Sequence, residues 1–257
     1  MTPETTATPS ADPVGSLAWL RSTGGLLTAS ERRALTRAIL AAQGGNLVGR
    51  LKLLLGRRPS AGPPELIDPP DTAMTRAAEE LCWEQPAPIA AHSARTWLFG
   101  AALAQYDSAD LDEELFYVAS LLHDVGLPES VPGQDFTLRS VAAAAEVVTT
   151  SGGTPTQTDA VSEAIARHTT PGVTSTSDGE LATYLQAGAL LDLAGVRSWD
   201  LSERFLAGVM REYDRRGFES EILAAIAAEA TAVPEGRFAL LARWGLPLAI
   251  KTAPFPR

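Results

Sequence analysis

Lysine is nearly absent from this chain of 257 residues, which contains just Lys52 and Lys251. The formal net charge is −10. This charge argues against binding to nucleic acid or to an anionic membrane, because both interactions depend on clustered lysine and arginine. Any anion would have to be held by arginine or by backbone amides. We therefore expect a small-molecule partner, with no nucleic acid and no membrane involved, and the sequence leaves a homo-oligomer open.

Long apolar runs and cysteines are also scarce. No stretch reaches the ~18 to 20 apolar residues that a membrane span needs. The N-terminus, residues 1–9, has neither the basic start nor the apolar core of a signal peptide, and we expect a disordered tail there. The single cysteine, Cys82, excludes an internal disulfide and fits a reducing cytosol. Because it lies in an ordinary amphipathic pattern, we interpret it as a core residue of a cytoplasmic protein.

Strand-like alternation is almost missing, and apolar residues recur at helical spacing between prolines and glycines instead. The sequence therefore predicts an all-α fold. In the first part of the chain, residues 17–57 suggest two or three short helices, the clearest after Thr28, which has capping-box spacing to Glu31. Asp71 is the expected cap of the next helix. The other expected helices span residues 71–83, 86–105, 110–124, 137–150, 158–169, 178–193, 201–213, 219–231 and 237–244.

A proline-rich segment divides the chain. Residues 59–70 hold five prolines, which predicts a linker. We expect residues 1–69 to form a flexible tail, accessory helices and this linker, and residues 70–257 to form the main helical domain. With 45% hydrophobic residues, the chain is most simply one domain with an extension, although two domains also fit its length.

A few polar residues stand within apolar helical segments. They are the three histidines, His92, His123 and His168, together with Asp124, which follows His123 directly, and Asp192. Burying an unpaired imidazole or carboxylate is costly, and both groups are good donors to a divalent metal. A lone inward histidine is usually a hydrogen-bonded core residue, but an inward aspartate is rarer. Several such residues on different helices are best explained by convergence on a cation.

The order His92, then His123-Asp124, then Asp192 resembles the H…HD…D pattern of the HD-domain superfamily. The resemblance implies an all-α HD-domain helical bundle over residues 70–257, with the N-terminal helical extension before it. It also implies that His92, His123, Asp124 and Asp192 bind one divalent metal ion. We expect zinc first, with iron or manganese as alternatives.

Several further segments resemble the cyanamide hydratase-type branch of that superfamily. That branch is named for fungal enzymes that add water to the nitrile of cyanamide to give urea. The resemblance implies a metal-dependent hydratase (a lyase) or hydrolase acting on a small uncharged substrate, such as a nitrile. The segments that carry it are residues 70–74, 92–100, 136–140, 164–168 and 250–255.

The expected mechanism follows from these ligands. A bound metal lowers the pKa of its water toward ~7, which supplies a nucleophile at neutral pH. The resemblance implies that Asp124 both binds the ion and accepts the proton of that water. His168, if it enters the pocket without binding the metal, could return a proton to the imidate nitrogen. A supporting hydrogen bond or a core position are the alternatives for His168, and Arg95 is expected to pair with a buried acid.

Other functions remain open at this stage. A phosphohydrolase acting on a phosphomonoester or nucleotide would need a cationic lining, which Arg139, Arg167 and Arg197 could supply despite the lysine shortage. Arg139 alternatively lies on a solvated helix face. A two-iron oxygenase is weaker, because three histidines are few ligands for two metals. A non-catalytic metal-binding or ligand-binding domain is less favoured, because no output domain is visible in the sequence.

Overall fold

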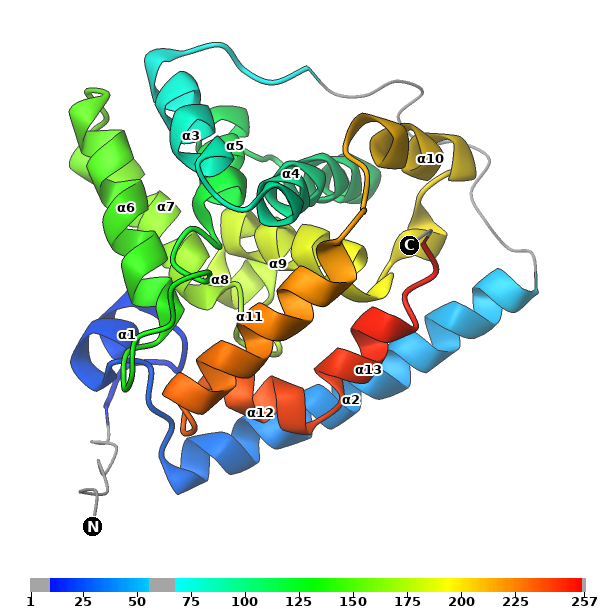
Figure 1. The fold of residues 1–257 in the computed structure, drawn as a ribbon, viewed down its shortest axis with the longest axis horizontal. Coiled ribbons are helices and arrows are strands. Elements are labelled where there is room, and N and C mark those ends of the chain that lie inside the picture. Colours follow the sequence, from blue (N-terminus) through cyan, green and yellow to red (C-terminus); the bar gives the residue numbers. More distant parts are fainter. Residues whose placement is uncertain (1–9, 56–67, 256–257) are drawn as a thin grey trace.

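The computed structural model describes residues 10–55 and 68–255 of the chain (Figure 1). The predicted tail and most of the predicted proline-rich linker lie outside these residues. The described part is helical, with one isolated bridge between Val131 and Gln134, so the all-α prediction is confirmed. None of its helices combines the length and apolarity needed to span a bilayer. The elements are α1 (Leu17–Thr23), α2 (Ala29–Leu54), α3 (Ala73–Trp83), α4 (Ala87–Asp107), α5 (Glu113–Leu122), α6 (Phe136–Thr150), α7 (Pro155–Arg167), α8 (Ser175–Asp178), α9 (Glu180–Ala194), the 3₁₀ helix η1 (Ser198–Asp200), α10 (Glu203–Glu212), α11 (Phe218–Ala232), α12 (Arg237–Arg243) and α13 (Leu246–Lys251).

Helix starts follow the capping residues of the sequence closely. The Asp112 side chain accepts a hydrogen bond from the Leu115 amide and so begins α5, two residues after the expected start at residue 110. The expected capping box at Thr28 is also present, because the Thr28 amide donates to the Glu31 carboxylate. The cap of α3 is Thr72 rather than the predicted Asp71, since Thr72 forms a capping box with Thr75.

The N-terminal segment differs from the prediction of two or three short helices. One of its two helices, α2, continues for 26 residues through Gly44 and Gly45. Its inner face packs on the rest of the protein: Ile39 is buried, and Gly49 lies against the Trp199 ring. This tertiary packing offsets the low helix propensity of the glycine pair.

Helices α4 and α9 pack along most of their lengths in antiparallel directions. A Cβ atom at Gly100 would lie 2.6 Å from the Tyr184 carbonyl oxygen, and one at Gly188 would lie 2.2 Å from the Thr96 carbonyl oxygen. The two glycines therefore allow a backbone approach that any larger residue would prevent. One helical turn from Thr96 and Gly188, the same antiparallel register brings His92 of α4 beside Asp192 of α9.

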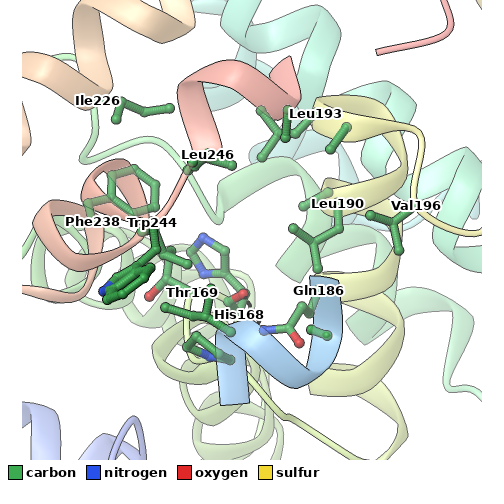
Figure 2. A pocket seen from close by; sticks show the side chains of 18 of the residues that line it. His168, Thr169, Gln186, Leu190, Leu193, Val196, Ile226, Phe238, Trp244 and Leu246 are labelled. Carbon is green, nitrogen blue, oxygen red and sulfur yellow. Dashed lines mark hydrogen bonds between the residues drawn. The ribbon is translucent and has the colours of Figure 1, made fainter. Parts of the chain in front are cut away.

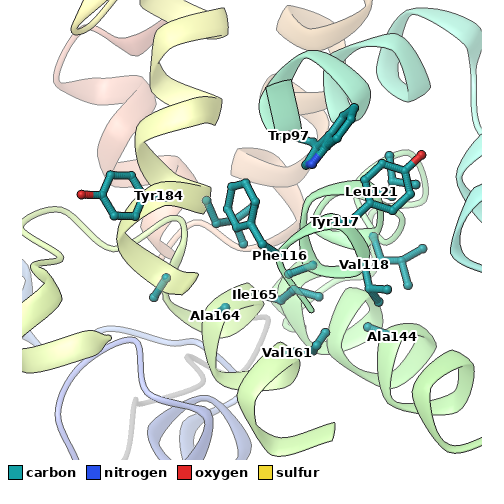
Figure 3. Close-up of a cluster of buried hydrophobic side chains, with 14 of the residues drawn as sticks. Trp97, Phe116, Tyr117, Val118, Leu121, Ala144, Val161, Ala164, Ile165 and Tyr184 are labelled. Carbon is teal, nitrogen blue, oxygen red and sulfur yellow. The ribbon is translucent and has the colours of Figure 1, made fainter. Parts of the chain in front are cut away.

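The other helices surround this pair. Figure 3 shows buried side chains from α4, α5, α6, α7 and α9 meeting in one core, with Phe116 among them. On the opposite side of the pair, α11, α12 and α13 form a second apolar cluster that includes Phe218, Ile222 and Ile226. Helix α2 packs against α12 and runs along one edge of the molecule (Figure 1). The first helix, α1, packs on α7, where the Leu17 amide donates to the Glu163 carboxylate.

Candidate metal centre

The fold brings the three histidines together in the interior. His92 projects from α4, whereas His123 and His168 are the residues that follow the last turns of α5 and α7. The ring centroids of His92 and His123 are 5.3 Å apart, and those of His123 and His168 are 4.9 Å apart. All three rings are buried, with 6% exposure or less. Residues from three separate helices thus converge as predicted from the sequence.

The partners of the ring nitrogens define one tautomer for all three histidines. The Nδ1 atoms of His123 and His168 lie 2.7 Å and 2.6 Å from backbone carbonyl oxygens of Ser120 and Ile165. His92 Nδ1 lies 2.7 Å from Asp192 Oδ2. Because these partners accept hydrogen bonds, each Nδ1 carries the proton and donates it. Each Nε2 therefore presents its lone pair on the other side of the ring.

Asp124 occupies the place toward which these lone pairs are directed. Its Oδ2 lies 3.7 Å from His92 Nε2 and 3.4 Å from His123 Nε2, and its Oδ1 lies 3.5 Å from His168 Nε2. Although they are buried, His92 Nε2, His123 Nε2 and Asp124 Oδ1 have no hydrogen-bond partner. A buried polar atom left unsatisfied costs about 1–3 kcal/mol, so three in one place call for an explanation.

A divalent cation provides that explanation. His92, His123 and Asp124 offer three donor atoms within 4.8 Å of one another. Two ligands bound about 2.1 Å from one ion are about 3.0–3.4 Å apart in octahedral or tetrahedral geometry, close to the observed spacings. The donor set of two imidazoles and a carboxylate suits zinc, iron or manganese. The residues present therefore fit the predicted ion.

Asp192 lies on the far side of the His92 ring. Besides accepting from His92 Nδ1, its carboxylate accepts from Arg95 at 2.8 Å and 2.9 Å, and from Arg215. It lies outside the group of three residues whose donor atoms come together. That Asp192 itself binds the ion stays a prediction. In this arrangement it orients His92, as a carboxylate behind a metal-binding histidine commonly does.

Charge and burial set the protonation states of the cluster. Burial would raise the pKa of Asp124, but the imidazoles of His123 and His168 hold that pKa well below its usual range. Burial lowers the pKa of His123 to about 3, so its ring is neutral at neutral pH. The Arg95 guanidinium outweighs burial at Asp192 and lowers that pKa too. The anionic carboxylates and neutral imidazole are the forms that bind metals.

Two residues of this site were not predicted from the sequence. The Phe218 ring stacks on the His92 ring at a centroid distance of 5.0 Å, and the guanidinium groups of Arg95 and Arg215 lie over Phe218. Arg215 precedes α11, and Phe218 is its first residue. Both lie at an ordinary polar turn, and no local sequence pattern indicates that either residue belongs to a metal site. The expected pairing of Arg95 with a buried acid is confirmed, and that acid is Asp192.

A cavity of about 210 Å³ opens onto the cluster. Figure 2 shows His168, Thr169 and Gln186 on one side of it, with Leu193, Ile226 and Leu246 on the opposite side. Helix α2 also contributes wall residues, including Ile39 and Asn46, which are part of the N-terminal extension. Among the described residues that line it, Asp124 is the one acid, and none is a lysine or arginine.

The three arginines considered for a phosphate site are engaged elsewhere. Arg139 donates to the Gly126 carbonyl oxygen rather than lining the cavity. Arg167 pairs with Glu163 and Asp178. Arg197 pairs with Asp107 and Asp200. These positions remove the argument, made from the sequence, that the three arginines could form a cationic lining for a phosphate substrate.

Comparison with known proteins agrees with this centre. A model of the HD domain matches residues 89–229, which is more than half of the chain and includes every residue of the cluster. The chain belongs to the HD domain family. Two proteins of Saccharomyces cerevisiae, cyanamide hydratase DDI2 and cyanamide hydratase DDI3, are each 31% identical over 143 residues. The match covers 52% of this chain and 62% of each relative, and it confirms the resemblance to the cyanamide hydratase-type branch.

Proposed function

We propose that this protein is a metal-dependent hydratase or hydrolase that adds water to a small uncharged substrate carrying a nitrile. The observation that carries the proposal is the set of three buried donor atoms, on His92, His123 and Asp124, with no partner and a cavity beside them. Similarity to two cyanamide hydratases makes cyanamide the first substrate to test.

A divalent ion on His92, His123 and Asp124, with zinc expected first, would act as a Lewis acid toward the nitrile or the attacking water. The protein's own groups then have separate tasks. Asp192 holds the His92 ring in place through its Nδ1 proton. The rings of His92 and Phe218 stack face to face, which fixes the ring plane further. Apart from Asp124, the described cavity wall carries no acidic or basic side chain other than the histidines, so it accepts an uncharged substrate without the desolvation cost of an unpaired charge.

Proton movement falls to Asp124 and His168. Asp124 Oδ1 accepts a proton from the attacking water, as the oxygen forms its bond to the nitrile carbon. His168 Nε2 lies 3.5 Å from that oxygen, too far for a strong direct hydrogen bond but within reach of a shared substrate or water proton. The proton passes from Asp124 through this shared water to His168 Nε2, which delivers it to the nitrogen as the first carbon–nitrogen π bond breaks. The remaining hydroxyl proton then moves to the same nitrogen, as the second carbon–nitrogen π bond is replaced by the carbon–oxygen π bond. The balance is one nitrile plus one water giving one amide, or urea when the nitrile is cyanamide.

The test combines elemental analysis with turnover. Protein purified without added metal should contain one divalent ion per chain, and metal-loaded protein should release urea from cyanamide. His123→Ala should lose the ion and the activity, because one of the donor nitrogens is removed. The exposed Glu146 provides a matched control, and Glu146→Ala should behave like wild type. Rapid cleavage of generic phosphoesters with no nitrile turnover would replace this proposal with the phosphohydrolase alternative.

A further inference from the structure

The cavity is larger and more apolar than cyanamide requires. Its volume of about 210 Å³ exceeds by more than tenfold the roughly 10–15 Å³ that holds one water molecule on the same measure. Cyanamide consists of a nitrile and an amino group alone, so it would occupy a small part of this space. The remainder faces hydrocarbon side chains. They are Leu190, Leu193, Ile222, Ile226, Phe238 and Leu246.

One face of α11 connects the candidate metal centre to this apolar wall. Phe218 stacks on the His92 ring, and Ile222 and Ile226 follow one and two helical turns later on the same face. Phe218 itself is fully buried and does not line the cavity, whereas Ile222 and Ile226 do, over about 6 Å of helix at 1.5 Å per residue. A substrate whose nitrile lies beside His92 would therefore have an apolar surface alongside the rest of its body.

The mouth of the cavity is formed by α2 and the segment after α12. Ala42 and Gln43 of α2 and Trp244 after α12 are exposed lining residues, whereas His92 and His123 are buried. Gln43 Nε2 donates to the Trp244 carbonyl oxygen at 2.6 Å, which joins the two sides of the mouth. The apolar residues and the reactive groups thus line one cavity with an opening to the surface, in which the body of a bound substrate would contact hydrocarbon.

We propose that the substrate is a neutral nitrile bearing an apolar group of about the size of a phenyl ring. This inference rests on the proposed function and adds the substrate class. The nitrile carbon bonds to the water oxygen, both carbon–nitrogen π bonds are replaced by a carbon–oxygen double bond, and both water protons end on the nitrogen of the product, a carboxamide that keeps the apolar group. The apolar group gains affinity by leaving water for the cavity, at about fourfold per buried methylene.

Binding and turnover test this inference separately. Calorimetry should show that phenylacetamide binds the metal-loaded protein at least tenfold more tightly than acetamide, with no reaction involved. With phenylacetonitrile and cyanamide as substrates, kcat/KM should be at least tenfold higher for phenylacetonitrile. Equal binding of the two amides, or a preference for cyanamide over phenylacetonitrile, would overturn the inference.

Two neighbouring residues of α13 provide matched variants. Ala249 lines the cavity, whereas Leu248 is 66% exposed and does not. Ala249→Phe fills the apolar space and should lower the ratio of the two kcat/KM values at least tenfold. Leu248→Phe adds a ring to the same helix outside the cavity and should leave the ratio as in wild type. A ratio unaffected by Ala249→Phe would contradict the proposed position of the apolar group.

The outcomes distinguish this inference from the function on which it rests. If phenylacetamide binds preferentially but metal-loaded protein hydrates no nitrile, the hydratase proposal fails and the apolar ligand class stands. If cyanamide is hydrated and the larger nitrile is not, the hydratase proposal stands and the inferred substrate class is wrong. The binding comparison in wild type holds even if Ala249→Phe does not fold.

Discussion

Two buried carboxylates lie on opposite sides of the His92 ring, and their surroundings differ sharply. Asp192 accepts hydrogen bonds from His92, Arg95 and Arg215. Asp124 has an oxygen with no hydrogen-bond partner and faces three imidazole nitrogens with free lone pairs. The first carboxylate has its interactions satisfied within the protein. The second has an oxygen without a partner in the protein. On the proposed function, this difference separates a carboxylate that positions His92 from one that binds the ion and accepts a proton.

Among the variants that test this comparison, Asp124→Asn should have the largest effect on activity. The variant removes an anionic ligand and the proposed proton acceptor, so we expect kcat/KM to fall by about 10²–10⁴ or more. Metal content by elemental analysis should fall with it. Near-wild-type turnover by this variant would contradict the role given to Asp124.

Asp192→Asn should lower both the free energy of unfolding and the metal affinity. Removing this charge leaves Arg95 and Arg215 buried without their anion, which should lower the free energy of unfolding by about 3–5 kcal/mol. Metal affinity should fall by about 10–100-fold, because the His92 ring loses its orienting carboxylate. Denaturant unfolding and metal titration measure the two effects.

The matched control is Asp107→Asn. Asp107 pairs with Arg197 at a site where about a third of its side chain is exposed, so its removal should cost less than about 1 kcal/mol. An Asp192→Asn variant as stable as Asp107→Asn would show that the Asp192 cluster does not hold the site together. Retained stability with complete loss of metal would instead favour Asp192 as a direct ligand.

Gly188→Ala changes the crossing of α4 and α9. It tests whether the close approach of these two helices aligns His92 with the two carboxylates. A Cβ at Gly188 would meet the Thr96 carbonyl oxygen at 2.2 Å, so Gly188→Ala must push the helices apart. We expect a loss of about 1–3 kcal/mol in the free energy of unfolding, together with weaker metal binding. Gly152→Ala is not a fair control, because Gly152 has a positive φ. Gly45→Ala is suitable, since nothing lies within 4 Å of that site.

The smallest effect concerns Cys82, which lies in the core away from both carboxylates. Burial raises the pKa of its thiol to about 12, so the thiolate is scarce at pH 8. A thiol reagent should therefore modify native protein far more slowly than unfolded protein, in which the pKa is near 9.0. Fast labelling of the native protein would show that this part of the core opens.

Local sequence patterns predicted most of the helical fold and the polar residues of the site. Capping residues such as Asp112 and the apolar spacing around His92 act over one or two turns, so they are visible in the sequence. The sequence did not indicate that α2 continues through Gly44 and Gly45, because this depends on packing against other helices. Its outward residues Leu40 and Leu47 are as apolar as the inward Ile39, so the sequence does not indicate which face packs.

The division of labour between the two aspartates also lay beyond local patterns. Asp124 and Asp192 both occur in apolar helical segments, and the sequence alone assigns both to the metal. What distinguishes them is Arg215 and Phe218, which reach the site from a distant part of the chain. Such contacts depend on tertiary packing rather than on spacing along one helix.

X-ray absorption at the metal edge tests the central claim most directly, on protein shown by elemental analysis to hold one ion per chain. The account predicts scattering from two imidazole rings bound through nitrogen at about 2.0–2.1 Å, with the remaining ligands oxygen. One of the imidazole contributions should disappear in His92→Ala. A bound ion whose spectrum shows no imidazole, or one unchanged by His92→Ala, would contradict the claim that His92, His123 and Asp124 share a metal.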